Sequence, residues 1–99
     1  MTQKEQLYYL IKEYNNGNYQ TDTFCDEFTR ILCLEKDGSL SSTEETIFRK
    51  SDEVFARFSP YEEDVKSGYL FGEDRIQKEF YKMLDMLKIK RFYDFPPKD

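Results

Sequence analysis

The chain has 99 residues, of which 35% are charged and 17% aromatic, and its formal net charge is −5. A chain of this length buries only about 60 to 65 per cent of its unfolded surface, so it builds one modest core. Eight tyrosines and nine phenylalanines can fill that core, which argues against disorder. No apolar run approaches the roughly 20 residues that cross a bilayer. Since the N-terminus also lacks the apolar core of a secretory signal, we expect a cytoplasmic protein.

Apolar residues at helical spacing predict two amphipathic helices in the first third of the chain. The first is expected at residues 3–15, where apolar side chains recur at intervals of three and four. The second is expected to begin at a side-chain cap supplied by Thr21 or Asp22 and to run to about Lys36.

Two further helices and a short helical turn are predicted after it. A capping box of Ser42 and Glu45 starts the third helix, whose apolar stripe continues to Phe58. The pair at residues 59–60, a serine followed by proline, is typical of a new helix start and predicts a short helical turn. The last helix is expected at residues 73–90.

Four amphipathic helices with short connections predict an all-α fold, an antiparallel four-helix bundle with a short extra helical turn between helices three and four. We expect one domain over residues 1–99, with an exposed loop at 66–72 and an extended C-terminal tail at 91–99. The side chains expected in the core are Leu7, Leu10, Ile11, Tyr14, Phe24, Phe28, Ile31, Leu32, Ile47, Phe48, Val54, Phe55, Phe58, Ile76, Phe80, Met83, Leu84 and Leu87.

The residues that catalysis and metal binding most often use are scarce. The chain has no histidine, the commonest general base, and no glycine-rich phosphate loop. Cys25 and Cys33 lie eight residues apart in one predicted helix, about 12 Å from each other, which is too far for a disulfide. We expect both to be small apolar core residues. Adjacent acids such as Glu62 and Glu63 point in different directions, which disfavours a metal site. We expect no enzymatic activity, no cofactor and no metal, and rank a carboxylate enzyme as the weakest alternative.

Charge is distributed unevenly along the chain. Residues 44–74 hold nine acids and four bases, whereas residues 75–98 hold seven bases and three acids. Like charges gathered on one surface repel one another and cost stability, which favours a cationic partner. The alternative is an ordinary solvated face, because acids in the first turn of a helix also complement its dipole. We expect the partner-binding residues to be Tyr61, Glu62, Glu63, Asp64, Tyr69, Glu73 and Asp74, with the tyrosines as aromatic anchors.

Several of these features resemble the colicin D immunity family. They are the order of the helices, the Phe-Cys-x-x-Phe sequence at residues 24–28, and Arg-Phe-Ser-Pro at 57–60 running into Glu62, Glu63 and Asp64. The resemblance covers residues 7 to about 87. It implies a four-helix bundle that neutralises a toxin cleaving the anticodon loop of transfer RNA by occupying the basic active-site cleft of the toxin.

The resemblance also implies roles for individual residues. Glu62, Glu63 and Asp64 would stand in for the phosphates of the RNA substrate, and Glu73 and Asp74 match the family more loosely. The loop at residues 65–72 departs from the family pattern, which leaves the identity of the nuclease open.

We therefore expect an immunity protein, monomeric and in a 1:1 complex with a bacteriocin or contact-dependent growth inhibition toxin, with no direct contact to nucleic acid or membrane. Two alternatives stay open. One is an acidic helical adaptor that binds a basic protein unrelated to toxins. The other is a nucleic-acid-binding protein that uses the basic, aromatic stretch at residues 88–93, although cations in the last turn of a helix are also favoured by its dipole.

Overall fold

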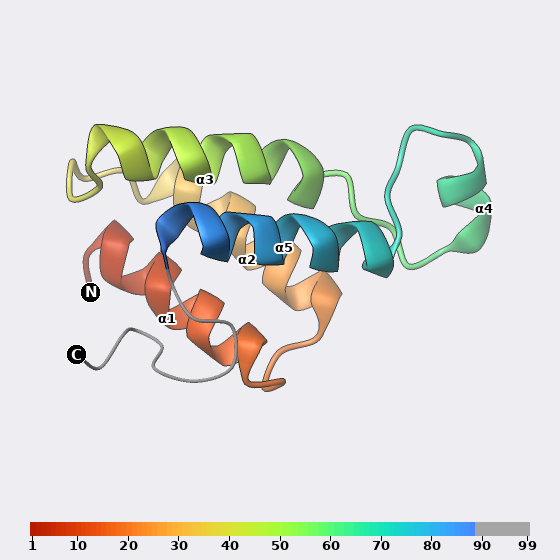
Figure 1. The fold of residues 1–99 in the computed structure, drawn as a ribbon, viewed down its shortest axis with the longest axis horizontal. Coiled ribbons are helices and arrows are strands. Elements are labelled where there is room, and N and C mark those ends of the chain that lie inside the picture. The colour runs from red at the N-terminus through yellow and green to blue at the C-terminus, as the bar shows by residue number, and fades with distance from the viewer. Residues whose placement is uncertain (89–99) are drawn as a thin grey trace.

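The computed structural model describes residues 1–88, which form the helices α1 (Gln3–Asn15), α2 (Thr21–Leu34), α3 (Ser42–Phe55), α4 (Glu62–Lys66) and α5 (Glu73–Leu87). The four long helices alternate in direction, and α1 packs on α2, α2 on α3, and α3 on α5 (Figure 1). The predicted all-α antiparallel four-helix bundle, with a short extra helix before the last long one, is confirmed. The predicted tail at 91–99 lies outside the described residues. None of the helices within residues 1–88 combines the length and apolarity needed to span a membrane.

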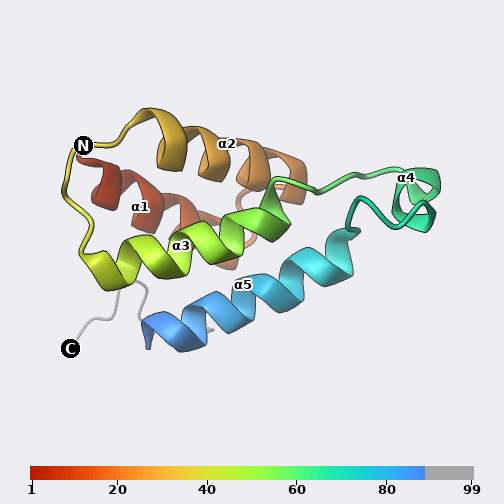
Figure 2. The ribbon, with the colours of Figure 1, turned by 90° about the horizontal axis from the view of Figure 1, so that it is seen from above.

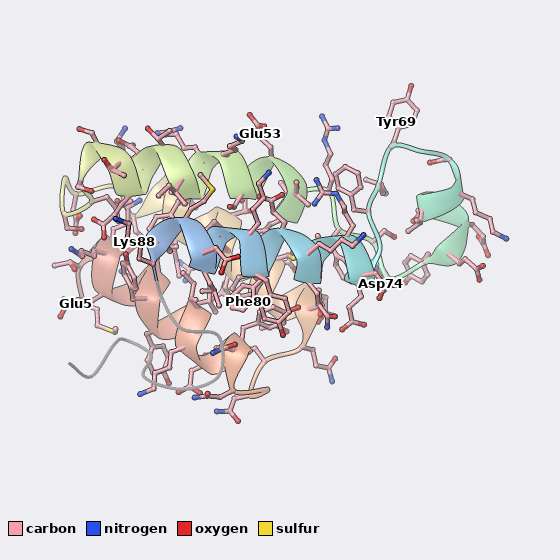
Figure 3. All side chains as sticks on the ribbon, in the orientation of Figure 1. Glu5, Glu53, Tyr69, Asp74, Phe80 and Lys88 are labelled. Atoms are coloured by element: carbon pink, nitrogen blue, oxygen red, sulfur yellow. The ribbon has the colours of Figure 1, made fainter. Side chains whose placement is uncertain are left out.

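Aromatic rings occupy the centre of the bundle. Phe24 and Phe28 of α2 each meet Phe55 of α3 edge to face, with ring centroids 5.1 and 4.9 Å apart. Phe80 points inward from α5 and meets Phe24 in the same way at 5.4 Å (Figure 3). This geometry sets the positive edge of one ring against the negative face of another. All the predicted core residues are buried except three that are half-buried at its edge, Tyr14, Phe58 and Leu87.

The two cysteines differ in their surroundings. Cys25 is buried, as predicted, whereas Cys33 is exposed and the prediction for it is wrong. Eight residues correspond to two full helical turns plus about 80° of rotation, which turns Cys33 from the buried side of α2 to its exposed side.

α3 begins with a capping box one residue earlier than predicted. The Ser41 hydroxyl accepts a hydrogen bond from the Glu44 N–H at 3.1 Å, and the Glu44 carboxylate accepts from the Ser41 N–H at 2.9 Å. The predicted pair, Ser42 and Glu45, has the same spacing, so spacing alone does not choose between them. Glu44 also accepts a hydrogen bond from the Tyr8 hydroxyl of α1 at 2.7 Å, a tertiary contact that favours the observed register.

The start of α2 differs from its prediction. The helix begins at Thr21 after Gln20, which provides no side-chain cap, so the predicted cap at Thr21 or Asp22 is wrong. The Thr21 hydroxyl instead hydrogen bonds with Tyr14 and Glu73, at 2.9 and 2.8 Å, and thereby joins three helices.

The end of α2 is capped by the start of α1. α2 ends at Leu34 and not at the predicted Lys36. The buried side-chain amide of Gln3 donates to the carbonyl oxygens of Ile31 and Leu32 at 3.3 and 3.0 Å. Carbonyls in a last helical turn have no donor within the helix, so this contact satisfies groups that would otherwise be buried without a partner.

Two other helices also end before their predicted limits. α3 ends at Phe55, because Phe58 leaves the helical path and forms an isolated bridge with Phe71. α5 ends at Leu87 and not at Lys90, since Lys88 adopts a left-handed conformation with φ of 61° that closes the helix.

Candidate partner-binding surface

Residues 58–71 form a loop, called here the α4 loop, that leaves the bundle after α3 and carries α4 beyond the bundle's end (Figure 2). Two backbone hydrogen bonds join its ends. The Ser59 N–H donates to the Phe71 carbonyl at 3.0 Å, and the Phe71 N–H donates to the Arg57 carbonyl at 2.8 Å. Compact loops whose ends are paired in this way are often functional. The bridge makes a narrow neck that fixes where α4 projects.

A clamp of side-chain hydrogen bonds orders the inside of the α4 loop. The Ser59 hydroxyl, which is buried, donates to the Asp64 carboxylate at 2.8 Å and accepts from the Tyr61 N–H at 3.2 Å. The short helix therefore begins at Glu62 with Tyr61 at its N-cap position. The predicted start, with Ser59 as the cap and Pro60 as the first helical residue, is wrong by two positions, although the Ser59 hydroxyl still accepts from a backbone N–H two residues later.

Four of the seven predicted partner-binding residues lie at the exposed surface of the α4 loop, and we call them the tip: Tyr61, Glu62, Glu63 and Tyr69. Tyr61 is 66% exposed and Tyr69 is 78% exposed, and Tyr69 points away from the loop (Figure 3). The Glu62 side chain is 82% exposed and forms an ion pair with Lys66 at 3.5 Å. Exposed pairs of this kind contribute little, so the carboxylate stays available to a partner.

The other three predicted residues lie elsewhere. Asp64 is half-buried in the clamp with Ser59. Glu73 is in the first turn of α5, where its carboxylate accepts the hydrogen bond from Thr21. Asp74 follows it, exposed at the base of the α4 loop (Figure 3). The predicted set is therefore divided between the tip, the clamp and the start of α5.

A cleft of about 480 Å³, which the sequence does not predict, lies at the base of the α4 loop between the α1–α2 connection and α5. Three tyrosines line it, Tyr14, Tyr19 and Tyr81, together with the carboxylates of Asp22 and Glu73. Among the described residues that line it there is no lysine or arginine. Its lining comes from separate parts of the chain, so no motif along the sequence marks it.

Hydrogen bonds hold Glu73 at the wall of this cleft. Thr21 donates its single hydroxyl proton to Glu73 Oε1, so in the contact between Tyr14 and Thr21 the tyrosine is the donor. Burial raises the pKa of Tyr14, which keeps that proton in place. This chain of hydrogen bonds from Tyr14 through Thr21 to Glu73 therefore orients the Glu73 carboxylate before any partner binds.

A buried carboxylate connects the bundle to the neck of the α4 loop. Glu79 is only 3% exposed, and it accepts hydrogen bonds from Arg75 at 3.2 Å and from the Ser51 hydroxyl at 3.4 Å. The Arg75 guanidinium in turn lies 5.3 Å from the centre of the Phe71 ring, in the range of a cation–π contact. The arginine thus joins the core of the bundle to the residue that closes the loop.

The remaining chemistry of the described residues is limited. Across residues 1–88, no group of three or more cysteine, aspartate or glutamate side chains is placed to hold a metal ion. The basic stretch considered for nucleic-acid binding begins at Lys88 and otherwise lies outside the described residues. No protein-family model, no curated protein and no solved structure matches the chain, so the tip and the cleft themselves carry the functional argument.

Proposed function

We propose that this protein is an immunity protein that inhibits a transfer-RNA-cleaving toxin by placing the tip in the toxin's basic active-site cleft. The observation that carries the proposal is the position of the tip, where exposed carboxylates and tyrosines project beyond the bundle on a loop closed at its neck. The resemblance of residues 57–64 to the colicin D immunity family supports the same function.

The chemistry of a nuclease cleft matches the tip. Such a cleft must present lysine and arginine side chains to hold the phosphates of RNA. Glu62 and Glu63 offer carboxylates that those cations can bind in place of phosphates. Tyr61 and Tyr69 add rigid, largely exposed rings of the kind that contribute strongly at protein interfaces.

The neck and the clamp favour tight binding. A flexible acidic loop would lose conformational entropy when it entered the cleft, and that loss would reduce affinity. In the α4 loop the Ser59 hydroxyl and the bridge to Phe71 already fix the backbone. The attraction between the acidic tip and a basic cleft also accelerates association, and it weakens as salt is added.

The direct test takes any nuclease domain encoded next to this gene and measures its cleavage of transfer RNA with and without an equimolar amount of this protein. We expect cleavage to stop. In the double variant Glu62→Lys/Glu63→Lys, we expect at least roughly tenfold weaker inhibition, because two attractive contacts become repulsive. Circular dichroism should show the same helix content as the wild type, since both side chains are exposed.

A matched control distinguishes the effect of charge at the tip from the effect of the protein's net charge. Asp26→Lys/Glu53→Lys makes the same change of charge at exposed positions of α2 and α3. It should inhibit nearly as well as the wild type, and equal losses in both double variants would remove the tip from the interface. If the wild-type protein neither stops cleavage nor forms a complex, the toxin proposal fails and the alternative of an acidic adaptor for another basic protein is favoured.

A further inference from the structure

We propose that the cleft at the base of the α4 loop is a second binding site, which receives one arginine side chain of the partner protein. This inference rests on the proposed function for the source of the arginine, a basic active-site cleft whose rim would reach the base of the loop once the tip is inserted. The chemistry of the site is argued from the cleft alone.

The size and charge of the cleft suit a cationic side chain. Its volume of about 480 Å³ falls within the range of roughly 300 to 1,000 Å³ that small-ligand sites occupy. Glu73 and Asp22 contribute negative charge to its lining, and among the lining residues that the structure describes no cation offsets it. A positively charged group therefore gains on entering, whereas a phosphate or carboxylate would be repelled.

The aromatic lining favours arginine over lysine. Tyr19 is half-buried and Tyr81 is 37% exposed, so both line the cleft while part of their surface is still accessible. A guanidinium is planar, stacks on aromatic rings and donates two parallel hydrogen bonds to a carboxylate. An ammonium is a compact, strongly hydrated point charge that matches neither feature.

Glu73 is prepared for such a contact. Only its Oε1 atom receives the hydrogen bond from Thr21, and a carboxylate has about four acceptor positions, so Oε2 can accept from a guanidinium. The bond from Thr21 also fixes the orientation of the carboxylate, which lowers the entropy that binding would cost.

An unsatisfied amide lies beside the cleft and suits an arginine that belongs to a polypeptide. Asn15 lines the cleft, and within the described part of the chain its Nδ2 is the one buried side-chain nitrogen or oxygen atom without a hydrogen-bond partner. A buried N–H group needs an acceptor, which a guanidinium or a metal cation cannot supply. Because the Asn15 nitrogen is closed to solvent, the backbone carbonyl beside an arginine can accept from it only after the Asn15 side chain turns toward the cleft.

The test uses the full chain and a capped arginine, N-acetyl-arginine amide, titrated at millimolar concentration and followed by two-dimensional ¹H–¹⁵N NMR. We expect saturable shifts of the Asn15 side-chain amide and of the backbone amides at Thr21 and Glu73. The matched neutral probe, N-acetyl-citrulline amide, has nearly the same shape without the charge and should produce no saturable shifts. Equal responses to both probes would overturn the inference.

Two variants sharpen the result. Glu73→Gln keeps an oxygen to accept from Thr21 but loses the charge, so binding of the arginine probe should weaken roughly tenfold or more. Glu53→Gln removes the same charge from an exposed position on α3 and should bind as the wild type does (Figure 3). Indistinguishable titrations of the two variants would contradict the site.

The toxin assay distinguishes this inference from the proposed function. Saturable arginine binding together with continued cleavage of transfer RNA would refute the toxin proposal and leave the cleft as an arginine site. Inhibition of the toxin without any arginine binding would refute the cleft and leave the tip as the interface.

Discussion

Replacing Ser59 with alanine should loosen the α4 loop without altering the charge of the tip. The Ser59 hydroxyl donates to the Asp64 carboxylate and accepts from the Tyr61 N–H, and alanine can do neither. The backbone bridge between residue 59 and Phe71 does not need the hydroxyl, so the neck should still form but open more often.

The size of the effect follows from the two lost hydrogen bonds. A neutral bond to a backbone N–H contributes about 1 kcal/mol, and a bond to a carboxylate contributes about 1.5 to 3 kcal/mol. Asp64 is only half-buried, so in the variant a water molecule can replace part of the hydrogen bonding that its carboxylate loses. We expect a net cost of about 2 kcal/mol to the closed loop, which corresponds to a roughly 30-fold larger equilibrium constant for opening.

Native-state amide hydrogen exchange measures this opening directly. The Phe71 N–H, which donates across the neck to Arg57, should exchange roughly 30-fold faster in Ser59→Ala, because exchange reports the free energy of local opening. Amides in the middle of α2 and α3 should keep their rates, since the bundle does not depend on the clamp. Ser42→Ala, at an exposed serine in the first turn of α3, is the control. An unchanged rate at Phe71 in Ser59→Ala would refute the role assigned to the clamp.

Three other predictions concern the bundle. Gln3→Ala should lower the free energy of unfolding by about 1 to 3 kcal/mol, because two carbonyls at the end of α2 lose a buried donor. Thermal unfolding should then show a melting temperature lower by roughly 4 to 8 °C per kcal/mol, and an unchanged value would contradict the cap. Burial raises the pKa of the Cys25 thiol to about 12, so a thiol reagent near neutral pH should label Cys33 alone in the folded chain. Mass spectrometry should find one label before and two after denaturation, and two labels on the folded chain would contradict the burial. Burial also raises the pKa of Asp52 above its ordinary 3.8, although its carboxylate accepts a hydrogen bond from Thr29. The folded state therefore binds this proton more tightly than the unfolded state, so stability should fall as pH rises from 3.8 through the folded pKa, and denaturant titrations of Asp52→Asn should lack that part of the fall.

The arrangement of the bundle could be predicted because apolar residues at intervals of three and four are a strong local signal. The boundaries were harder, since tertiary contacts decide them. Ser41 and Ser42 each have a glutamate three residues later, and the hydrogen bond from Tyr8 to Glu44 helps select the first pair. Thr21 could cap α2 by sequence, but its hydroxyl is drawn to Tyr14 and Glu73.

The buried polar residues were missed although the sequence contains a signal for them. Glu79 lies three residues after Ile76 and four before Met83, so it occupies a core position of the helical repeat. Gln3 lies four residues before Leu7 in the same way. A polar residue at such a position predicts a buried hydrogen bond, yet the identity of its partner depends on the packing of other helices.

The candidate site could likewise be predicted only in part. The exposure of the tip could be expected from a charged stretch between two long helices, and Tyr61, Glu62, Glu63 and Tyr69 are indeed exposed. The separate places of Asp64, Glu73 and Asp74 could not be predicted, because they depend on the clamp and on the contact between α2 and α5. The cleft could not be predicted either, since it exists only where the α1–α2 connection, the neck and α5 meet.

Placing the acidic tip on a clamped loop separates the demands of binding from those of folding. Acids on a packed face of the bundle would repel one another at the expense of the core's stability, because the helices could not move apart without losing apolar contacts. On the α4 loop the same repulsion acts against the bridge at Phe71 and the clamp at Ser59, which can open without unfolding the bundle. Changes at the tip should therefore alter affinity for a basic partner while leaving the stability of the bundle nearly constant. Glu79 is an exception, because it contacts Arg75 and Arg75 lies against Phe71 at the neck. A change at Glu79 should therefore alter both the stability of the bundle and the opening of the α4 loop.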